Sequence, residues 1–279
     1  MKLVQQDYKP IGVFDSGYGG LTILKSIMTE LPQYDYIYLG DNARAPYGSR
    51  SYDVVYEYTL QAITHLFSQG CELIIVACNT ASAKALRTIQ QNDLPLIDSS
   101  KRVLGVIRPS VEKIPQYTSN GHVGVLGTTG TILSGSYPME IAKVSNNEIL
   151  VTQEACPMWV PLVENDELES VAADYFVSRN IQNLFEKDPQ IDTVILGCTH
   201  YPLLIPTIQK FLPSHVQLLE QGPIVAVSLR DYLNRHPEME QICSKKGSLK
   251  LLTTESVQNF EPRASLFLGR QVKAEKIQL

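Results

Sequence analysis

Two cysteines occupy matching places in the sequence. Cys78 follows the apolar run Leu73–Ala77, and Cys198 follows Thr193–Leu196; hydrogen-bonding residues and a helical pattern come next in both cases. The N-terminus of a helix presents free N–H groups and partial positive charge, which lowers the pKa of a thiol and raises its thiolate content. The pair therefore predicts reactive thiols. The alternative is that both are small, buried hydrophobic side chains.

The other three cysteines lack this setting. Cys71 precedes its apolar run, Cys156 lies in a proline-flanked loop, and Cys243 lies in a polar stretch, so we expect structural roles for them. An odd, sparse set of cysteines is typical of free thiols in a reducing compartment. Zinc is an alternative use of the paired cysteines. However, the sequence has no C-x-x-C or H-x-x-x-H spacing and suggests no fourth ligand, so we predict no metal site.

More polar clusters follow other apolar runs: Asp15-Ser16-Gly17, the loop from Asp41 to Ser49, and Thr128-Thr129. In open α/β sheets, ligands bind beyond the carboxyl ends of the strands, where these clusters would meet. The glycines after Asp15 match neither G-x-G-x-x-G nor a P-loop, and the Asp15 carboxylate would repel a phosphate. We therefore expect them to let the backbone approach a small ligand.

Short apolar runs alternate with helical patterns along the whole chain, which is typical of a parallel α/β protein. The expected strands are Ile11–Phe14, Tyr36–Leu39, Leu73–Ala77, Val103–Ile107, Val123–Leu126, Ile149–Thr152, Thr193–Leu196, Val216–Leu219 and Leu249–Thr253. The expected helices are Leu21–Glu30, Tyr52–Gln69, Ala81–Gln91, Leu168–Phe185, Leu203–Phe211 and Ile224–Asn234.

The two cysteine segments resemble each other, and so do GVFDSG at residue 12 and GVLGTT at residue 124. These echoes predict two pseudo-symmetric, doubly wound parallel-sheet lobes. Crossings near Asp93–Lys101 and Leu212–His215 would divide the chain into residues 1–100 plus 214–279, which hold Cys78, and residues 101–213, which hold Cys198.

Composition narrows the function further. Hydrophobic residues are 44% of the 279, enough for a substantial core, and the net charge of −5 argues against a general nucleic-acid binder. No apolar run reaches the 18 residues of a membrane span, and the N-terminal MKLVQQDYKP lacks the apolar core of a signal peptide. We therefore expect a cytoplasmic protein without membrane partners.

Several motifs together resemble those of the bacterial glutamate racemases. They are the DSG-x-GG segment from Asp15, the segment from Asp41 that includes Pro46-Tyr47-Gly48, ACNTA around Cys78, GCTHYP around Cys198, and ACP with PLVE from Ala155 to Glu164. The match spans roughly residues 12 to 204. The resemblance implies an active site between the two lobes, a substrate of L- or D-glutamate, and no cofactor. The resemblance is also compatible with a homodimer.

The same resemblance carries residue roles to this chain. It implies that Cys78 and Cys198 are catalytic, assisted by Asp15, His200 and Glu154. The substrate-binding residues that it implies are Asp15, Ser16, Pro46, Tyr47, Gly48, Asn79, Thr80, Thr128, Thr199 and His200.

Simpler interpretations stay open for some of these residues. Asp15 and Ser16 could form a turn or helix cap, and His200 could be a packing histidine. Glu154 could be a solvated loop charge, and Tyr47 could belong to a rigid turn.

In such an enzyme, a thiolate on one face of Cα removes the proton, and a thiol on the other face returns one. The product would feed peptidoglycan synthesis.

An aspartate racemase is the nearest alternative to a glutamate racemase, because one methylene changes the binding free energy little. A binding protein without catalysis is another. Two departures from the family pattern, one around Arg108 and Ser110 and the other at Glu220-Gln221-Gly222, concern interfaces and regulation rather than chemistry.

Overall fold

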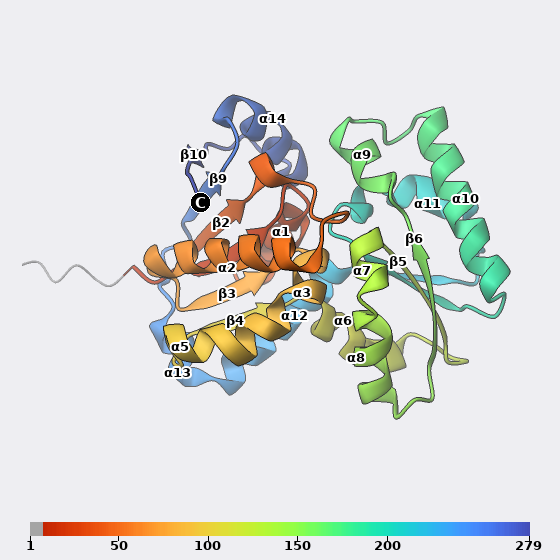
Figure 1. The fold of residues 1–279 in the computed structure, drawn as a ribbon, viewed down its shortest axis with the longest axis horizontal. Helices are drawn as coiled ribbons and strands as arrows, with labels where there is room; N and C mark the ends of the chain where they lie inside the picture. Colours follow the sequence, from red (N-terminus) through yellow and green to blue (C-terminus); the bar gives the residue numbers. More distant parts are fainter. Residues whose placement is uncertain (1–7) are drawn as a thin grey trace, which may run out of the picture.

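The computed structural model describes residues 8–279, which form two lobes, each built on its own parallel β-sheet (Figure 1). The N-terminal segment MKLVQQDYKP, in which the sequence predicts no signal peptide, lies mostly outside this range, because residues 1–7 are not among the described residues. Among the described residues, no helix is long and apolar enough to cross a membrane. The predicted fold class, two doubly wound parallel-sheet lobes, is confirmed.

The first lobe has a six-stranded sheet in the order β10-β9-β2-β1-β3-β4, with every neighbouring pair parallel. Its strands are β1 (Ile11–Asp15), β2 (Tyr36–Gly40), β3 (Leu73–Val76), β4 (Arg102–Gly105), β9 (Leu249–Thr253) and β10 (Glu275–Lys276). The helices on this lobe are α1 (Gly20–Glu30), α2 (Tyr52–Ser68), α3 (Asn79–Lys84), α4 (Leu86–Thr88), α5 (Leu94–Ile97), α12 (Gln221–Arg235), α13 (Pro237–Ile242) and α14 (Val257–Leu268). A π-helical stretch at Ile89–Asp93 joins α4 to α5.

Both faces of this sheet are covered, because successive side chains of a strand point to opposite faces. Val13 belongs to a core cluster with buried residues of α1, α12 and α14. Its neighbour Phe14 belongs to a second cluster with buried residues of α2. This two-sided burial explains why the strands are continuous apolar runs rather than alternating ones.

The second lobe has a four-stranded sheet in the order β6-β5-β7-β8. Its strands are β5 (His122–Gly127), β6 (Leu150–Ala155), β7 (Thr193–Gly197) and β8 (Gln217–Leu219). Its helices are α6 (Ile107–Lys113), α7 (Thr129–Leu133), α8 (Ser136–Ser145), α9 (Trp159–Glu164), α10 (Val171–Lys187) and α11 (Ile205–Phe211), with 3-10 turns at Ile114–Gln116 and Tyr201–Leu204. Figure 1 shows α6 and α7 facing α12 and α3 of the first lobe, and these pairs are in contact.

The sheet pairings move both lobe boundaries relative to the expected division at residues 100/101 and 213/214. β4 pairs with β3 in the first lobe, so the chain crosses only after Gly105. β8 pairs with β7 in the second lobe, so the chain returns only after Leu219. The predicted crossings were placed in polar stretches, but each sheet takes one more edge strand before the chain leaves it. Asp93–Lys101 instead completes a helical turn and leads into β4.

Candidate active site

A cavity of about 100 Å³ lies between the lobes, where the carboxyl ends of the two sheets meet. Its walls come from the segments after β1, β2 and β3 in the first lobe, and from those after β5, β6 and β7 together with α9 in the second. The lining residues are Ser16, Gly17, Ala45, Pro46, Tyr47, Gly48, Ser49, Cys78, Asn79, Thr80, Thr128, Thr129, Pro157, Val160, Pro161, Glu164, Cys198, Thr199 and His200. The structure thus brings together both cysteines and every predicted substrate-binding residue except Asp15.

Cys78 caps the N-terminus of α3. Its Sγ accepts a hydrogen bond from the Ala81 amide at 3.4 Å and lies 3.4 Å from Oγ of Ser16. Burial, with the nearby Asp15 carboxylate adding to it, raises the pKa of the Cys78 thiol to about 12. The expected lowering by the helix N-terminus is therefore outweighed. A helix of six residues offers little dipole, whereas burial removes the solvent that would stabilise a thiolate.

Cys198 directly follows β7 and has a different neighbour from Cys78. Its Sγ lies 3.9 Å from Nδ1 of His200, and the other ring nitrogen, Nε2, lies 3.1 Å from Oε1 of Glu164. Burial opposes protonation of His200, but these two partners prevail and raise the pKa of the imidazole to about 10. At neutral pH the site therefore holds an imidazolium between Cys198 and Glu164. The interpretation of His200 as a packing residue does not account for this pairing.

Asp15 lies behind the cavity wall rather than on it. Its Oδ1 accepts from the Gly17 amide at 2.8 Å, and its Oδ2 accepts from the Thr199 hydroxyl, in the opposite lobe, at 3.4 Å. Burial raises the pKa of its carboxyl. Asp15 thus fixes the loop that carries Ser16 and adds negative charge near Cys78, while Ser16 itself lines the cavity.

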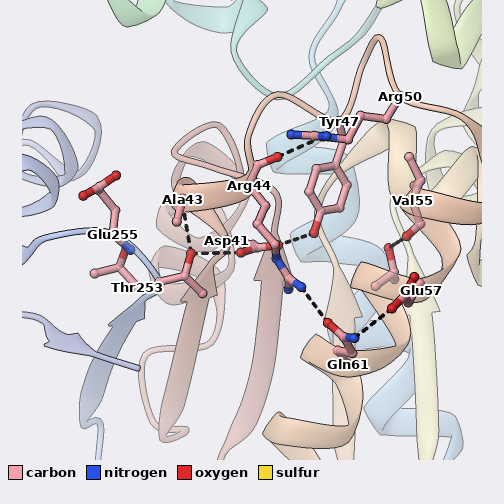
Figure 2. A network of polar contacts seen from close by, with 12 residues as sticks. Asp41, Ala43, Arg44, Tyr47, Arg50, Val55, Glu57, Gln61, Thr253 and Glu255 are labelled. Atoms are coloured by element: carbon pink, nitrogen blue, oxygen red, sulfur yellow. Dashed lines mark hydrogen bonds and ion pairs between the residues drawn. The ribbon is translucent and has the colours of Figure 1, made fainter. Parts of the chain in front are cut away.

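The loop after β2 places Tyr47 in the cavity wall, where its ring is buried. Figure 2 shows the polar network that holds it: the Tyr47 hydroxyl and Nε of Arg44 both donate to Oδ2 of Asp41. Arg44 Nη1 then donates to Gln61 on α2 at 2.6 Å. The loop is therefore a rigid turn and a wall of the cavity at once, and the two interpretations of Tyr47 are compatible.

Hydroxyl groups join the lobes on the far side of this loop. Oγ1 of Thr80 lies 2.9 Å from Oγ1 of Thr128, and the Gly130 amide donates to the Gly48 carbonyl at 2.7 Å. A Cβ atom on Gly48 would lie 2.9 Å from Cβ of Thr128, so this approach requires glycine. Thr80, Thr128 and Gly48 thus form one wall across the lobe junction.

Gly19 allows a similar approach beside Cys198. A Cβ atom there would lie 2.3 Å from Oγ1 of Thr199 and 2.5 Å from Nδ1 of His200. Next to it, the Thr22 hydroxyl donates to the Thr199 carbonyl at 3.0 Å. Gly19 therefore serves close contact between the lobes, and the approach of this glycine segment to a ligand stays a prediction.

The structure places Glu154 outside the lining of the cavity that holds both cysteines. Its buried carboxylate is held by Asn180, Asn183 and Lys187 on α10, at 2.6 to 3.0 Å, which keeps its pKa below the usual range although burial opposes this. Neighbouring residues of a strand point to opposite faces, and β6 turns this side chain toward the helix. The glutamate that reaches His200 is Glu164, at the end of α9. Its signal in the sequence was the PLVE string.

The other cysteines are buried away from the cavity. Cys156 packs in the core shared by the lobes, and Cys71 and Cys243 lie in the first lobe. Within residues 8–279, no group of three or more His, Cys, Asp or Glu side chains is placed to hold a metal ion.

Comparison with known proteins decides the family. Residues 18–229 match the family described as Asp/Glu/Hydantoin racemase. This chain belongs to that family. It is 38% identical over 270 residues to the glutamate racemase of Persephonella marina, covering 96% of this chain and 97% of that one.

Two solved structures agree closely with the fold of this racemase. The glutamate racemase isoform RacE1 from Bacillus anthracis is 34% identical, covers 98% of this chain and 99% of its own, and superimposes with a TM-score of 0.88. The glutamate racemase from Francisella tularensis, solved in complex with D-glutamate, is 31% identical, covers 98% of both chains, and has a TM-score of 0.85. The chain is accordingly an isomerase.

Proposed function

We propose that this racemase interconverts L- and D-glutamate, using Cys78 and Cys198 as the two acid/base groups. The observation that carries the proposal is that two thiols, one from each lobe, line the same small cavity between the sheets. The names and the near-complete coverage of its relatives support glutamate as the substrate.

The proposed reaction conserves protons, because one proton leaves one face of Cα and another is added to the opposite face. One cysteine, as thiolate, takes the Cα proton, so the Cα–H bond breaks and an S–H bond forms. The electron pair left on Cα spreads into the substrate carboxylate. The other cysteine, as thiol, gives its proton to the opposite face of Cα and is left as the thiolate. The reverse reaction starts from that state with the roles exchanged.

The growing charge on the carboxylate needs hydrogen-bond donors in a water-poor cavity. Asn79, Thr80, Thr128 and Thr199 all line the cavity and are at least nine-tenths buried, which suits them to this task. Backbone N–H groups at the start of α3 add further donors.

Unlike charges flank the two thiols. His200, whose pKa is raised, lies beside Cys198, and Glu164 holds its ring. Around Cys78, burial and the Asp15 carboxylate favour the neutral thiol and outweigh the hydrogen bonds from Ser16 and the Ala81 amide, which favour the thiolate. In the resting enzyme we therefore expect Cys78 to be the protonated thiol.

Circular dichroism of the purified protein with each enantiomer of glutamate and aspartate, without added cofactor, tests the proposal. We expect both glutamates to converge on a racemic mixture, with aspartate much slower. Faster racemisation of aspartate would overturn the substrate. A binding protein without catalysis would show no exchange of the Cα hydrogen of L-glutamate in deuterium oxide.

We further propose that the enzyme acts in the cytoplasm and supplies D-glutamate for peptidoglycan. All five cysteines are free thiols, which suits a reducing compartment. Deleting the gene should create a requirement for D-glutamate, and growth without it would contradict the role. The homodimer stays a prediction, to be checked by sedimentation velocity.

A further inference from the structure

Three buried side chains beside the cavity form a closed ring of hydrogen bonds. Nδ2 of Asn79 donates to Oε1 of Gln221 at 2.6 Å, and Nε2 of Gln221 donates to the Tyr137 hydroxyl at 2.9 Å. The Tyr137 hydroxyl donates in turn to Oδ1 of Asn79 at 2.8 Å. Each side chain gives one hydrogen to the ring and accepts one, and none is more than 2% exposed.

The ring leaves the Asn79 amide a single orientation. Turning it over would set its N–H₂ group against the Tyr137 hydroxyl and its oxygen against Oε1 of Gln221, so two acceptors would face each other. In the observed orientation, Asn79 keeps one N–H outside the ring. Asn79 directly follows Cys78 and lines the cavity, and the ring leaves this N–H without a partner among its members.

The ring members come from three separate parts of the fold. Asn79 begins α3 in the first lobe, Tyr137 lies on α8 in the second, and Gln221 begins α12 just after the chain returns. Nε2 of Gln221 also contacts the Val106 carbonyl at 3.1 Å, where the chain first crosses, and Oγ of Ser110 at 3.0 Å. The ring therefore links both crossings and both lobes to one cavity donor.

We propose that Gln221 and Tyr137 are positioning residues, which hold the Asn79 amide so that it donates to the substrate carboxylate when the lobes have this arrangement. The inference rests on the proposed racemase function. The carboxylate gains charge as the Cα proton leaves, so an aligned donor stabilises the transition state more than the bound substrate. Losing the alignment should therefore lower kcat more than it raises KM.

Two substitutions test the ring. Tyr137→Phe keeps the aromatic ring but removes two of the three hydrogen bonds, and Gln221→Met keeps the length of the side chain but removes the amide. We expect each to lower kcat about tenfold in both directions, equivalent to about 1.4 kcal/mol, with KM within about threefold of wild type. Because the ring acts as a unit, the double variant should be at most about twofold slower than the slower single one.

Two control substitutions separate this role from a purely structural one. Tyr36→Phe also removes a buried tyrosine hydroxyl, one that donates to the Leu31 carbonyl at 2.7 Å in the first-lobe core. Ser110→Ala removes a contact of Gln221 outside the ring and leaves Nε2 its bond to Val106. Both should keep kcat within about twofold of wild type, even where they lower the melting temperature.

The proposal is overturned if Tyr137→Phe is no slower than Tyr36→Phe, or if the losses in the double variant multiply. If Gln221→Met does not fold, the comparison of the two tyrosine variants decides. A wild-type protein that neither racemises glutamate nor exchanges its Cα hydrogen would instead contradict the proposed function, so the two failures are distinguishable.

Discussion

Replacing each of two glutamates by glutamine should separate stability from catalysis. Glu154 accepts hydrogen bonds from Asn180, Asn183 and Lys187 at 2.8, 3.0 and 2.6 Å. Glu154→Gln removes the charge opposite Lys187, whose side chain is 50% exposed and therefore well screened. We expect a loss of about 1 kcal/mol of stability, roughly a 2 °C fall in melting temperature, and a kcat within about twofold of wild type.

Glu164→Gln should have the opposite pattern. Glu164 is partly exposed, and within residues 8–279 its carboxylate has one hydrogen bond, to Nε2 of His200 at 3.1 Å, so its loss should cost less than about 0.5 kcal/mol. The same change removes the carboxylate that helps to keep His200 protonated. A mispositioned or neutral imidazole beside Cys198 should lower kcat about 10- to 100-fold.

Thermal melting and circular dichroism in both reaction directions measure the two effects. Equal loss of kcat in folded Glu154→Gln and Glu164→Gln would refute the assignment and restore Glu154 as a catalytic candidate. The pH dependence adds a check. The pKa of Glu154 is lowered on folding, so its stabilisation is present above the ordinary value of 4.5 and lost as pH falls through the lower folded value. The stability gap to Glu154→Gln should shrink over that range.

Three further predictions follow from the site. Cys78→Ser and Cys198→Ser should each abolish racemisation, whereas Cys156→Ser should behave like wild type. Given a substrate analogue with a leaving group on Cβ, each of the first two variants should catalyse elimination from only one enantiomer, and the two should prefer opposite enantiomers. If polarimetry shows that both prefer the same enantiomer, the thiols do not lie on opposite faces of Cα. Gly19→Ala places a methyl group 2.5 Å from Nδ1 of His200 and should lower kcat/KM over 100-fold with little change in far-UV circular dichroism; near-normal activity would disprove the tight junction. Because the pKa of His200 is raised to about 10, kcat/KM should fall as pH rises through that value. If the pH–rate profile of His200→Asn shows the same fall in kcat/KM, a group other than His200 causes it.

Most of the fold could be predicted because its strands are buried on both faces. A parallel strand between two helix layers is a continuous apolar run, as in Leu73–Val76, and such runs stand out in a sequence. Strands at the edges of the sheets were harder to predict from the sequence. β10 has two exposed, charged residues, Glu275 and Lys276, and nothing in their types indicates pairing.

The lobe boundaries failed for a related reason. Polar composition suggested crossings at Asp93–Lys101 and Leu212–His215, but β4 and β8 each hydrogen-bond to the sheet that the chain is about to leave. Composition shows where the chain is exposed, whereas the pairing partner of an edge strand depends on tertiary structure.

The cavity residues at strand ends were predictable because a parallel sheet gathers all its carboxyl ends at one edge. Glu164 follows no strand, and it reaches His200 only because α9 packs over that edge. Likewise, the departures at Ser110 and Gln221 lie 111 residues apart, and only the fold shows that their side chains are 3.0 Å from each other at the lobe crossings.

The electrostatics of the thiols needed the structure most. The sequence places both cysteines before helices, and the helix dipole alone would treat them alike. Burial and the Asp15 charge instead raise the pKa of Cys78, whereas Cys198 faces the imidazolium of His200. A two-base enzyme needs one protonated and one deprotonated group at the start of each turnover, so unlike surroundings are useful where identical ones would leave both thiols in the same state. The pseudo-symmetry of the lobes places the two thiols on one cavity, and the differences between the lobes give them the unlike surroundings that the proposed mechanism needs.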